Sequence, residues 1–171
     1  MHPAYRRATR AAETAAAALG RVTQMEGGPV TIELVEACSD ELVEAFARLL
    51  PQLSTSAAVD RGALQAVIDA EASSLFVARL GRGIVGMATL VAFPIPTGLR
   101  CFIEDVVVDE PARRAGVGAA LVDALVAHAR RLGARNVDLT SRPTREAANR
   151  LYLRKGFVVR DTNVYRLTLD N

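Results

Sequence analysis

Small residues and arginines gather in the segment from Arg113 to Ala119, where a helix is expected to begin. The segment reads Arg113-Arg114-Ala115-Gly116-Val117-Gly118-Ala119, and Ala115, Gly116 and Gly118 carry no large side chain. The first N–H groups of a helix lack carbonyl partners and carry about half a positive charge. Glycines let a ligand approach that backbone closely, and arginines add forked donors beside it. We therefore predict an anion site suited to a pyrophosphate, with close helix packing as the alternative.

The elements on either side of this segment would hold it in place. Ile103–Val108 is a short, β-branched apolar run, which predicts a central strand. After the glycines, apolar residues recur at helical spacing until Gly133, at Val117, Leu121, Leu125, His128 and Leu132. The segment lacks the Gly-Lys-Ser/Thr ending of a P-loop and does not match the GxGxxG dinucleotide fingerprint.

The rest of the chain alternates between strand and helix patterns. We predict strands at Val30–Ala37, Leu75–Leu80, Ile84–Phe93, Asn136–Thr140, Phe157–Val159 and Val164–Leu169. We predict helices over Asp40–Leu50, capped by Ser39 and ended by Pro51, from Asp60 onward, and over Arg145–Lys155 with Gly156 at its end. Gly81-Arg82-Gly83 indicates a hairpin, and loops are expected at Ser54–Val59 and Pro94–Gly98. This order is typical of a mixed α/β fold.

Composition excludes several classes of protein. The chain has 171 residues, half of them apolar, and a net charge of +2, which favours neither nucleic acid nor a membrane surface. Residues 29–112 hold twelve acids and five arginines, whereas residues 113–160 hold eleven Lys and Arg and three acids. The later part therefore suits an anionic ligand and the earlier part a cationic one, unless the acids are simply a solvated face.

Short segments of the sequence predict the cellular location of the protein and the redox state of its cysteines. No apolar run approaches a membrane span, and Ala15–Leu19 is too short for a secretory signal, so we expect a cytoplasmic protein. Cys38 and Cys101 form no CxxC pattern and are expected to be reduced and buried. Residues 1–28 are rich in Ala and Arg and are predicted to be an N-terminal extension, a presequence or a helical arm. The main domain would be residues 29–171.

The pattern Arg113-x-x-Gly116-x-Gly118 resembles the Q/R-x-x-G-x-G/A signature of the GNAT superfamily of acyl-CoA-dependent N-acetyltransferases. The similarity continues through Asn149-Arg150-Leu151-Tyr152 and Gly156-Phe157, and covers residues from about Val30 to Leu169. It implies a mixed α/β fold with a central, mostly antiparallel sheet and helices on both faces. It also implies an enzyme that moves an acetyl group from acetyl-CoA to a primary amine.

The resemblance assigns roles to individual residues. The pyrophosphate would bind the N–H groups from Arg114 to Ala119 beside Arg113, and the pantetheine arm would pair with Val106, Val107 and Val108. Tyr152 is the expected general acid, since a phenol with a pKa of about 10 stays protonated at neutral pH; a packed tyrosine is the alternative. Glu104 is the expected base, because a buried carboxylate has a raised pKa; binding the amine or pairing with an arginine are alternatives.

Two positions depart from the family pattern. Thr140 stands where some members carry a glutamate base, and Arg145 stands where many carry an asparagine. Asn149 is therefore the candidate for the side-chain contact to pantetheine.

The remaining expectations concern partners and metals. We see no metal-ligand set, and His128 on the apolar stripe is expected to be a core histidine. The Arg-rich half lacks interleaved aromatics, which argues against nucleic acid. A small-molecule amine is favoured over a protein acceptor, and dimers are frequent in the family. A non-catalytic acyl-CoA-binding sensor or interaction module is the alternative function.

Overall fold

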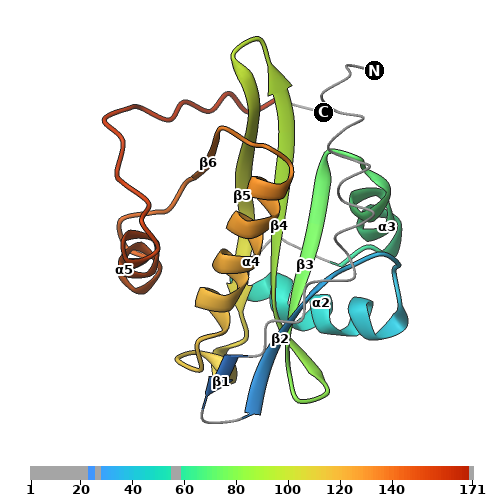
Figure 1. Ribbon diagram of the computed structural model, residues 1–171. Helices are drawn as coiled ribbons and strands as arrows, with labels where there is room; N and C mark the ends of the chain where they lie inside the picture. The colour runs from blue at the N-terminus through green and yellow to red at the C-terminus, as the bar shows by residue number, and fades with distance from the viewer. Residues whose placement is uncertain (1–22, 26–27, 55–58, 170–171) are drawn as a thin grey trace. The chain divides into compact units, whose positions relative to one another are not determined.

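The computed structural model describes residues 23–25, 28–54 and 59–169 of the chain (Figure 1). It divides into two units, residues 1–140 and residues 141–171, and each is described by itself. The helix considered near Tyr5–Leu19 and most of the loop predicted at Ser54–Val59 lie outside the described residues. The boundary near residue 28 stays a prediction.

A six-stranded sheet in the described part of the chain forms the centre of the first unit. Its strands follow one another in sequence order: β1 Thr23–Met25, β2 Gly28–Leu34, β3 Ser73–Leu80, β4 Gly83–Ile95, β5 Gly98–Val108 and β6 Asn136–Leu139. Neighbouring strands are antiparallel except for β5 and β6, which are parallel. The predicted mostly antiparallel α/β sheet is confirmed.

Two connections differ in how well the sequence predicted them. The β3–β4 hairpin turns at Gly81, whose φ of +61° is the left-handed conformation that glycine adopts without strain. The five-residue loop predicted at Pro94–Gly98 is wrong, because β4 and β5 stay paired as far as Ile95 and Gly98. Proline interrupts a strand ladder only where a backbone N–H is required at its position. Pro94 therefore stays within β4, and the chain turns at Pro96 and Thr97.

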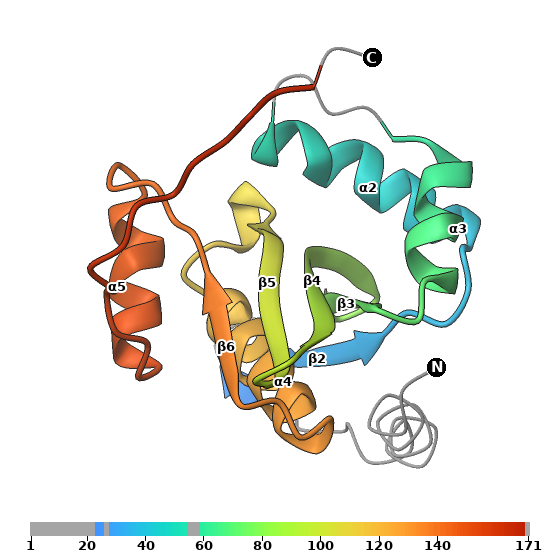
Figure 2. The same cartoon turned by 90° about the horizontal axis from the view of Figure 1, so that it is seen from above.

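Helices cover both faces of this sheet (Figure 2). Helices α2 (Asp40–Leu53) and α3 (Arg61–Asp69) lie on one face, and α4 (Val117–Arg131) lies on the other. The predicted end of α2 at Pro51 is wrong. Proline in a last turn removes one N–H, yet the Ser54 N–H still bonds the Leu50 carbonyl at 3.0 Å, and the helix continues to Leu53.

Each face of the sheet has its own buried side chains. The α2 and α3 face includes Phe46, Leu49, Val77, Met87 and Val107, all buried. The α4 face is sealed by apolar residues of the helix at the predicted spacing, Val117, Leu121, Val122 and Leu125. At about 25 cal/mol per Å² of buried apolar surface, these contacts supply the main force that seats α4 and its N-terminal turn.

Strand β5 contains an irregularity near its C-terminal end. Met87 pairs with Val107, but Thr89 pairs with Glu104, so three residues of β5 advance against two of β4. Asp105 has a φ of +54°, a left-handed conformation that Asp tolerates better than most residues. This is a β-bulge, and it reverses the in-and-out alternation of side chains along β5.

The second unit contains helix α5, Glu146–Arg154, close to the predicted bounds. The Gly156 N–H bonds the Leu153 carbonyl at 3.0 Å with a φ of +86°, so Gly156 ends the helix as expected. The strands predicted at Phe157–Val159 and Val164–Leu169 are wrong, since none of these described residues is in a strand. Their apolar side chains are exposed, Val159 and Tyr165 at 87%. A β pattern forms a strand only where a second backbone completes the ladder.

Candidate functional site

The turn between β5 and α4 places several backbone N–H groups at one point. After a short 3₁₀ turn at Glu110–Ala112, Arg114 and Gly116 both adopt the left-handed conformation, with φ values of +72° and +76°. The first helical bond of α4 runs from the Ala120 N–H to the Gly116 carbonyl, at 3.0 Å. Helix geometry therefore leaves the N–H groups of Val117, Gly118 and Ala119 without carbonyl partners inside the helix.

The start of α4 has no acidic or capping side chain. Gly116 makes no side-chain cap, and the first turn of the helix contains no acid. The partial positive charge at the helix start is therefore not neutralised by this turn itself. An anion with several oxygens, such as a pyrophosphate, matches this arrangement of donors.

Arg113 is held by neighbouring groups of the first unit. Its Nε donates to the Val108 carbonyl at 3.3 Å and its guanidinium to Gln52 Oε1 at 3.2 Å. Gln52 also accepts from the Glu110 N–H and donates to Asp109 at 2.9 Å. The hydrogen bond from Gln52, followed by that from Arg48, lowers the pKa of Asp109. Gln52 thus ties the last turn of α2 to the glycine turn, a role with no signal in the sequence.

The C-terminal part of β5 has only one strand neighbour in the described part of the chain. Pairing of β5 with β6 ends at Ile103 and Leu139, whereas Val107 and Val108 pair with Met87 and Gly86 of β4. The edge of β5 beyond Ile103 therefore lacks a partner strand on the β6 side. An extended arm can add to such an edge through backbone hydrogen bonds.

Glu104 lies one residue before the bulge and is exposed. The expectation that this carboxylate is buried is therefore wrong, because the sheet face around it is only partly covered. Its place next to Asp105 and Val106 keeps it beside the strand edge just described. A base on this surface would exchange protons with water directly.

Tyr152 and Asn149 belong to the second unit, whereas residues 104–108 and 113–119 belong to the first. The surroundings of Tyr152 and Asn149 are therefore described within their own unit. Tyr152 is half-buried and contacts Phe157 edge-to-face, with ring centres 5.9 Å apart. Burial raises the pKa of the Tyr152 phenol, and the charge of Arg145 opposes this shift. The Asn149 amide donates to the carbonyls of Arg142 and Pro143, at 2.9 and 3.4 Å, and so holds the start of α5.

His128 is a buried core residue, as predicted. Its Nε2 lies 3.2 Å from Ser74 Oγ, its Nδ1 lies 3.1 Å from the Arg131 guanidinium, and its ring meets Phe76 edge-to-face. Arg131 can only donate, so Nδ1 accepts and Nε2 carries the proton. Burial, with a smaller effect of Arg131, lowers the pKa of His128 to about 4. The ring is neutral at physiological pH and fills the α4 core.

Both cysteines are free thiols. Cys101 is buried, which raises the pKa of its thiol to about 11, and Cys38 is half-buried. Within the described ranges, no group of three His, Cys, Asp or Glu side chains is placed to hold a metal ion. None of the helices in these ranges combines the length and apolar composition needed to cross a bilayer.

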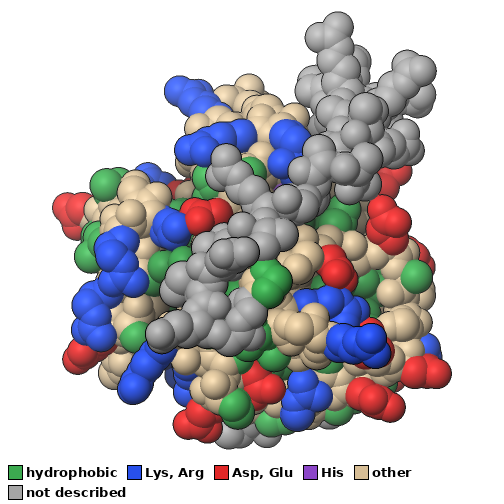
Figure 3. Space-filling view, turned by 60° about the horizontal axis from the view of Figure 1, so that its bottom comes forward, with side chains coloured by type: hydrophobic (Ala, Val, Ile, Leu, Met, Phe, Trp, Pro, Cys, Tyr) green, Lys and Arg blue, Asp and Glu red, His purple; other side chains and the backbone are tan. Residues whose placement is uncertain are grey.

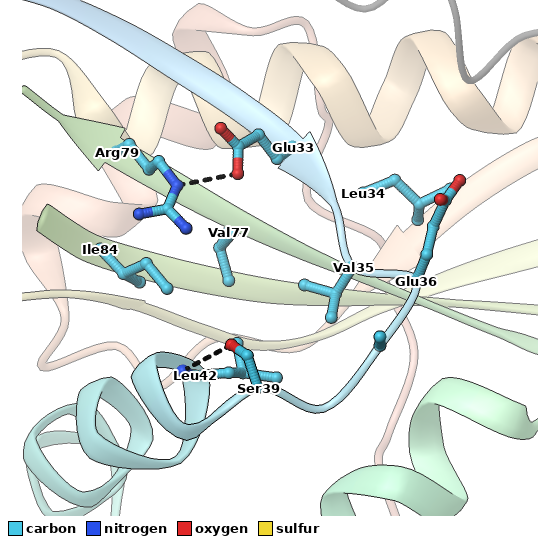
Figure 4. A pocket seen from close by; sticks show the side chains of 10 residues that line it. Glu33, Leu34, Val35, Glu36, Ser39, Leu42, Val77, Arg79 and Ile84 are labelled. Carbon is cyan, nitrogen blue, oxygen red and sulfur yellow. Dashed lines mark hydrogen bonds and ion pairs between the residues drawn. The ribbon is translucent and has the colours of Figure 1, made fainter. Parts of the chain in front are cut away.

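A hollow of about 170 Å³ lies elsewhere in the first unit, between the C-terminal end of β2 and the start of α2 (Figure 4). At its rim, Arg79 donates to Glu33 at 2.8 Å and to both oxygens of Glu41, at 2.5 and 2.8 Å. These bonds raise the pKa of Arg79 and lower that of Glu41. Two carboxylates share one arginine here, which fits a structural ion-pair cluster. Basic and acidic side chains are also interspersed over the surface in Figure 3.

Comparison with known proteins agrees with this geometry. The model of the acetyltransferase (GNAT) family matches residues 34–157. No curated protein matches the chain. A Trypanosoma brucei acetyltransferase is 26% identical, with a TM-score of 0.68 over 82% of this chain and 99% of that one.

Two further structures share the fold at lower identity. An aminoglycoside acetyltransferase from an uncultured soil metagenomic sample has a TM-score of 0.69 at 22% identity, over 82% of this chain and 97% of its own. Glucosamine-6-phosphate N-acetyltransferase from Arabidopsis thaliana has a TM-score of 0.67 at 18% identity, over 80% and 98%. Because the family model spans most of the described residues, the chain belongs to the GNAT family of acetyltransferases.

Proposed function

We propose that this acetyltransferase moves the acetyl group of acetyl-CoA to a primary amine of a small molecule, with Tyr152 as general acid and Glu104 as the proton acceptor. The observation that carries the proposal is the start of α4, which has no side-chain cap, beside the edge of β5 beyond Ile103, which lacks a partner strand among the described residues. The N–H groups of Val117, Gly118 and Ala119 would hold the pyrophosphate, with Arg114 beside them. Backbone groups of Val106, Val107 and Val108 would pair with the pantetheine arm.

The reaction requires two proton movements around one bond exchange. The amine nitrogen attacks the thioester carbonyl carbon, the new C–N bond forms, and the C–S bond breaks. The departing thiolate takes the phenolic proton of Tyr152, and the excess proton on nitrogen passes to Glu104, directly or through water. The raised pKa of Tyr152 supports its role, because the phenol stays protonated throughout the physiological range.

Acetyl-CoA turnover with a panel of amines tests this proposal directly. Release of free CoA thiol that depends on the amine, with an acetylated product of matching mass, is the expected result. Calorimetry with CoA on the same preparation separates the alternative: tight binding without turnover on any amine would indicate a sensor or interaction module.

The Tyr152→Phe variant tests the general acid. We expect kcat to fall by about ten- to ten-thousand-fold while acetyl-CoA affinity stays within about twofold, since only the transferable proton is lost. Because the pKa of Tyr152 is raised above its usual value near 10, wild-type kcat should not decline on the alkaline side until above about pH 10. A fully active variant would remove Tyr152 from this role.

A further inference from the structure

The two faces of strands β4 and β5 can be assigned residue by residue. An added Cβ on Gly86 would lie 3.1 Å from a methyl group of Val117, so Gly86 faces α4. Met87 belongs to the core under α2 and α3. Alternation along β4 then turns Thr89, Val91 and Phe93 towards the α2 and α3 side.

Cross-strand pairing extends this assignment to β5 and β6. Glu104 pairs with Thr89, Phe102 with Val91, and Arg100 with Phe93. Paired residues share a face, so these three side chains also lie on the α2 and α3 side. On β6, Asp138 pairs with Phe102 and joins them. Through the bulge, Glu104 lies on the same face as Val107, three residues away.

The two faces differ in how well they are covered. On the α4 side, Leu90, Ala92, Cys101 and Ile103 are between 0% and 7% exposed. On the other side the buried core continues on β3 to Leu75, which pairs with Thr89. Along β4 and β5, however, it stops at Met87 and Val107, and the residues beyond them are half-buried or exposed, with Phe93 at 36%. Val91, Phe93 and Phe102, called here the apolar patch, therefore meet solvent beside Glu104.

We propose that the apolar patch holds the body of the acceptor, and that the acceptor is a primary amine two or three carbons from an aromatic or branched apolar group. This inference rests on the proposed function, which places the attacking nitrogen near Glu104. Two residues along a strand span about 7 Å, so a nitrogen at Glu104 lies that far from a group over Phe102. A spacer of two or three carbons covers this distance.

The charges around the patch fit the same class of acceptor. Glu104 lies at one end of the patch, so a carboxylate is next to the place of the ammonium group, whereas Arg100 lies on the same face at the other end, paired with Phe93. Asp138 lies beside Phe102, where the apolar group would bind, and its carboxylate accepts from the Asn136 amide at 3.1 Å. Flat apolar rings pack well against phenylalanine side chains, whereas a sugar ring would leave its hydroxyl groups against an apolar surface without partners. The patch therefore selects against polyhydroxylated amines.

Matched amines and matched variants test the proposal. With acetyl-CoA as donor, kcat/KM for 2-phenylethylamine should exceed that for ethylamine and for glucosamine by about ten- to a hundredfold. Phe102→Ala should lower kcat/KM for 2-phenylethylamine by about tenfold and leave that for ethylamine nearly unchanged. Leu99→Ala is the control, because Leu99 is half-buried on the opposite face of the same strand.

The outcomes separate this inference from the proposed function. Transfer to ethylamine or glucosamine as fast as to 2-phenylethylamine would overturn the acceptor class but keep the acetyltransferase. Equal losses on both amines in Phe102→Ala would show that the patch packs against protein, and would also overturn it. Phe93→Ser gives a second variant, at a more exposed position, if Phe102→Ala does not fold. Absence of transfer to every amine would refute the proposed function itself.

Discussion

Helices α2 and α4 begin in opposite ways within the same unit. At the start of α2, Ser39 Oγ accepts from the Leu42 N–H at 3.2 Å, and Asp40 and Glu41 add negative charge to the first turn. At the start of α4, Gly116 has no side chain to cap the helix, and no acid follows. Helix α3 resembles α2, since Asp60 accepts from the Ala63 N–H at 2.6 Å.

The difference separates a helix whose first turn carries its own cap and acids from one whose first turn carries neither. A capping side chain contributes about 1 kcal/mol to stability, so leaving it out has a cost. At α4 the missing cap coincides with left-handed residues and preceding arginines, whereas α2 and α3 carry their own oxygens.

Giving α4 an acidic start like that of α3 should have the largest effect. In Gly116→Asp the carboxylate would occupy the charge and space meant for the pyrophosphate, so acetyl-CoA affinity should fall by about a hundredfold or more, as measured by calorimetry. Gly116→Asn is the matched control, because it has the same shape and also tolerates the left-handed conformation without adding charge. If both variants lose affinity equally, bulk rather than charge explains the effect.

The opposite end of α4 should make stability depend on pH. Since the pKa of His128 is about 4 in the folded protein and 6.5 when unfolded, the unfolded chain binds more protons between these values. Stability is therefore intact above pH 6.5 and is lost as pH falls towards 4, by at most about 3 kcal/mol from this residue. Urea unfolding across this range, compared with His128→Gln, measures the slope; identical slopes would contradict the buried neutral imidazole.

Adding a methyl group at Gly86, against the first turn of α4, should have a moderate effect on acetyl-CoA binding. In Gly86→Ala the added Cβ would lie 3.1 Å from both Val117 Cγ1 and the Val107 carbonyl oxygen, displacing the helix start or the strand. We expect KM for acetyl-CoA to rise about tenfold with a smaller change in kcat. Gly83→Ala is the control, since nothing lies within 4 Å of its added Cβ.

A shortened donor sharpens that test. Acetyl-pantetheine lacks the pyrophosphate, so Gly86→Ala should affect its use less than it affects acetyl-CoA. An equal loss with both donors would indicate a general distortion of β4 and β5 rather than of the helix start.

Removing the cap of α2 should have the smallest effect and leave the chemistry alone. Ser39→Ala should lower the free energy of unfolding by about 1 kcal/mol, because the Leu42 N–H loses its acceptor. Acetyl-CoA affinity should not change. A loss of affinity in this variant would mean that the two helix starts are not independent.

Local features of this chain were predictable from the sequence, and tertiary ones were not. Ser39, Asp60 and Gly156 act within a few residues of themselves: Ser39 and Asp60 cap the starts of their helices, and Gly156 ends its helix, as predicted. The bulge at Asp105 depends on how β5 pairs with β4. The continuation of α2 past Pro51 is a local exception, in which the Ser54 N–H still bonds the Leu50 carbonyl. The C-terminal strand prediction failed because a local pattern does not reveal whether a partner backbone exists.

The candidate site shows the same division. The glycine turn stood out because its residue types are unusual for a helix start, but Gln52 lies 57 residues before Asp109 and carries no signal of its own. Glu104 was expected to be buried but is exposed. The expectation failed because a strand pattern shows neither which face a residue occupies nor whether a helix covers that face. The roles of Tyr152, Glu104 and Asn149 stay predictions.

The inserted residue Asp105 fixes the length of β5 more strictly than its exposed position implies. Before it, Cys101 and Ile103 are anchored under one layer of helix; after it, Val107 is anchored under the other. Deleting Asp105 would restore even alternation, which would turn either Val107 out of its core or Glu104 into the apolar layer below α4. The strand therefore tolerates substitution at Asp105 far better than a change in length. The number of residues between Ile103 and Val107 keeps the Glu104 carboxylate on its side of the sheet.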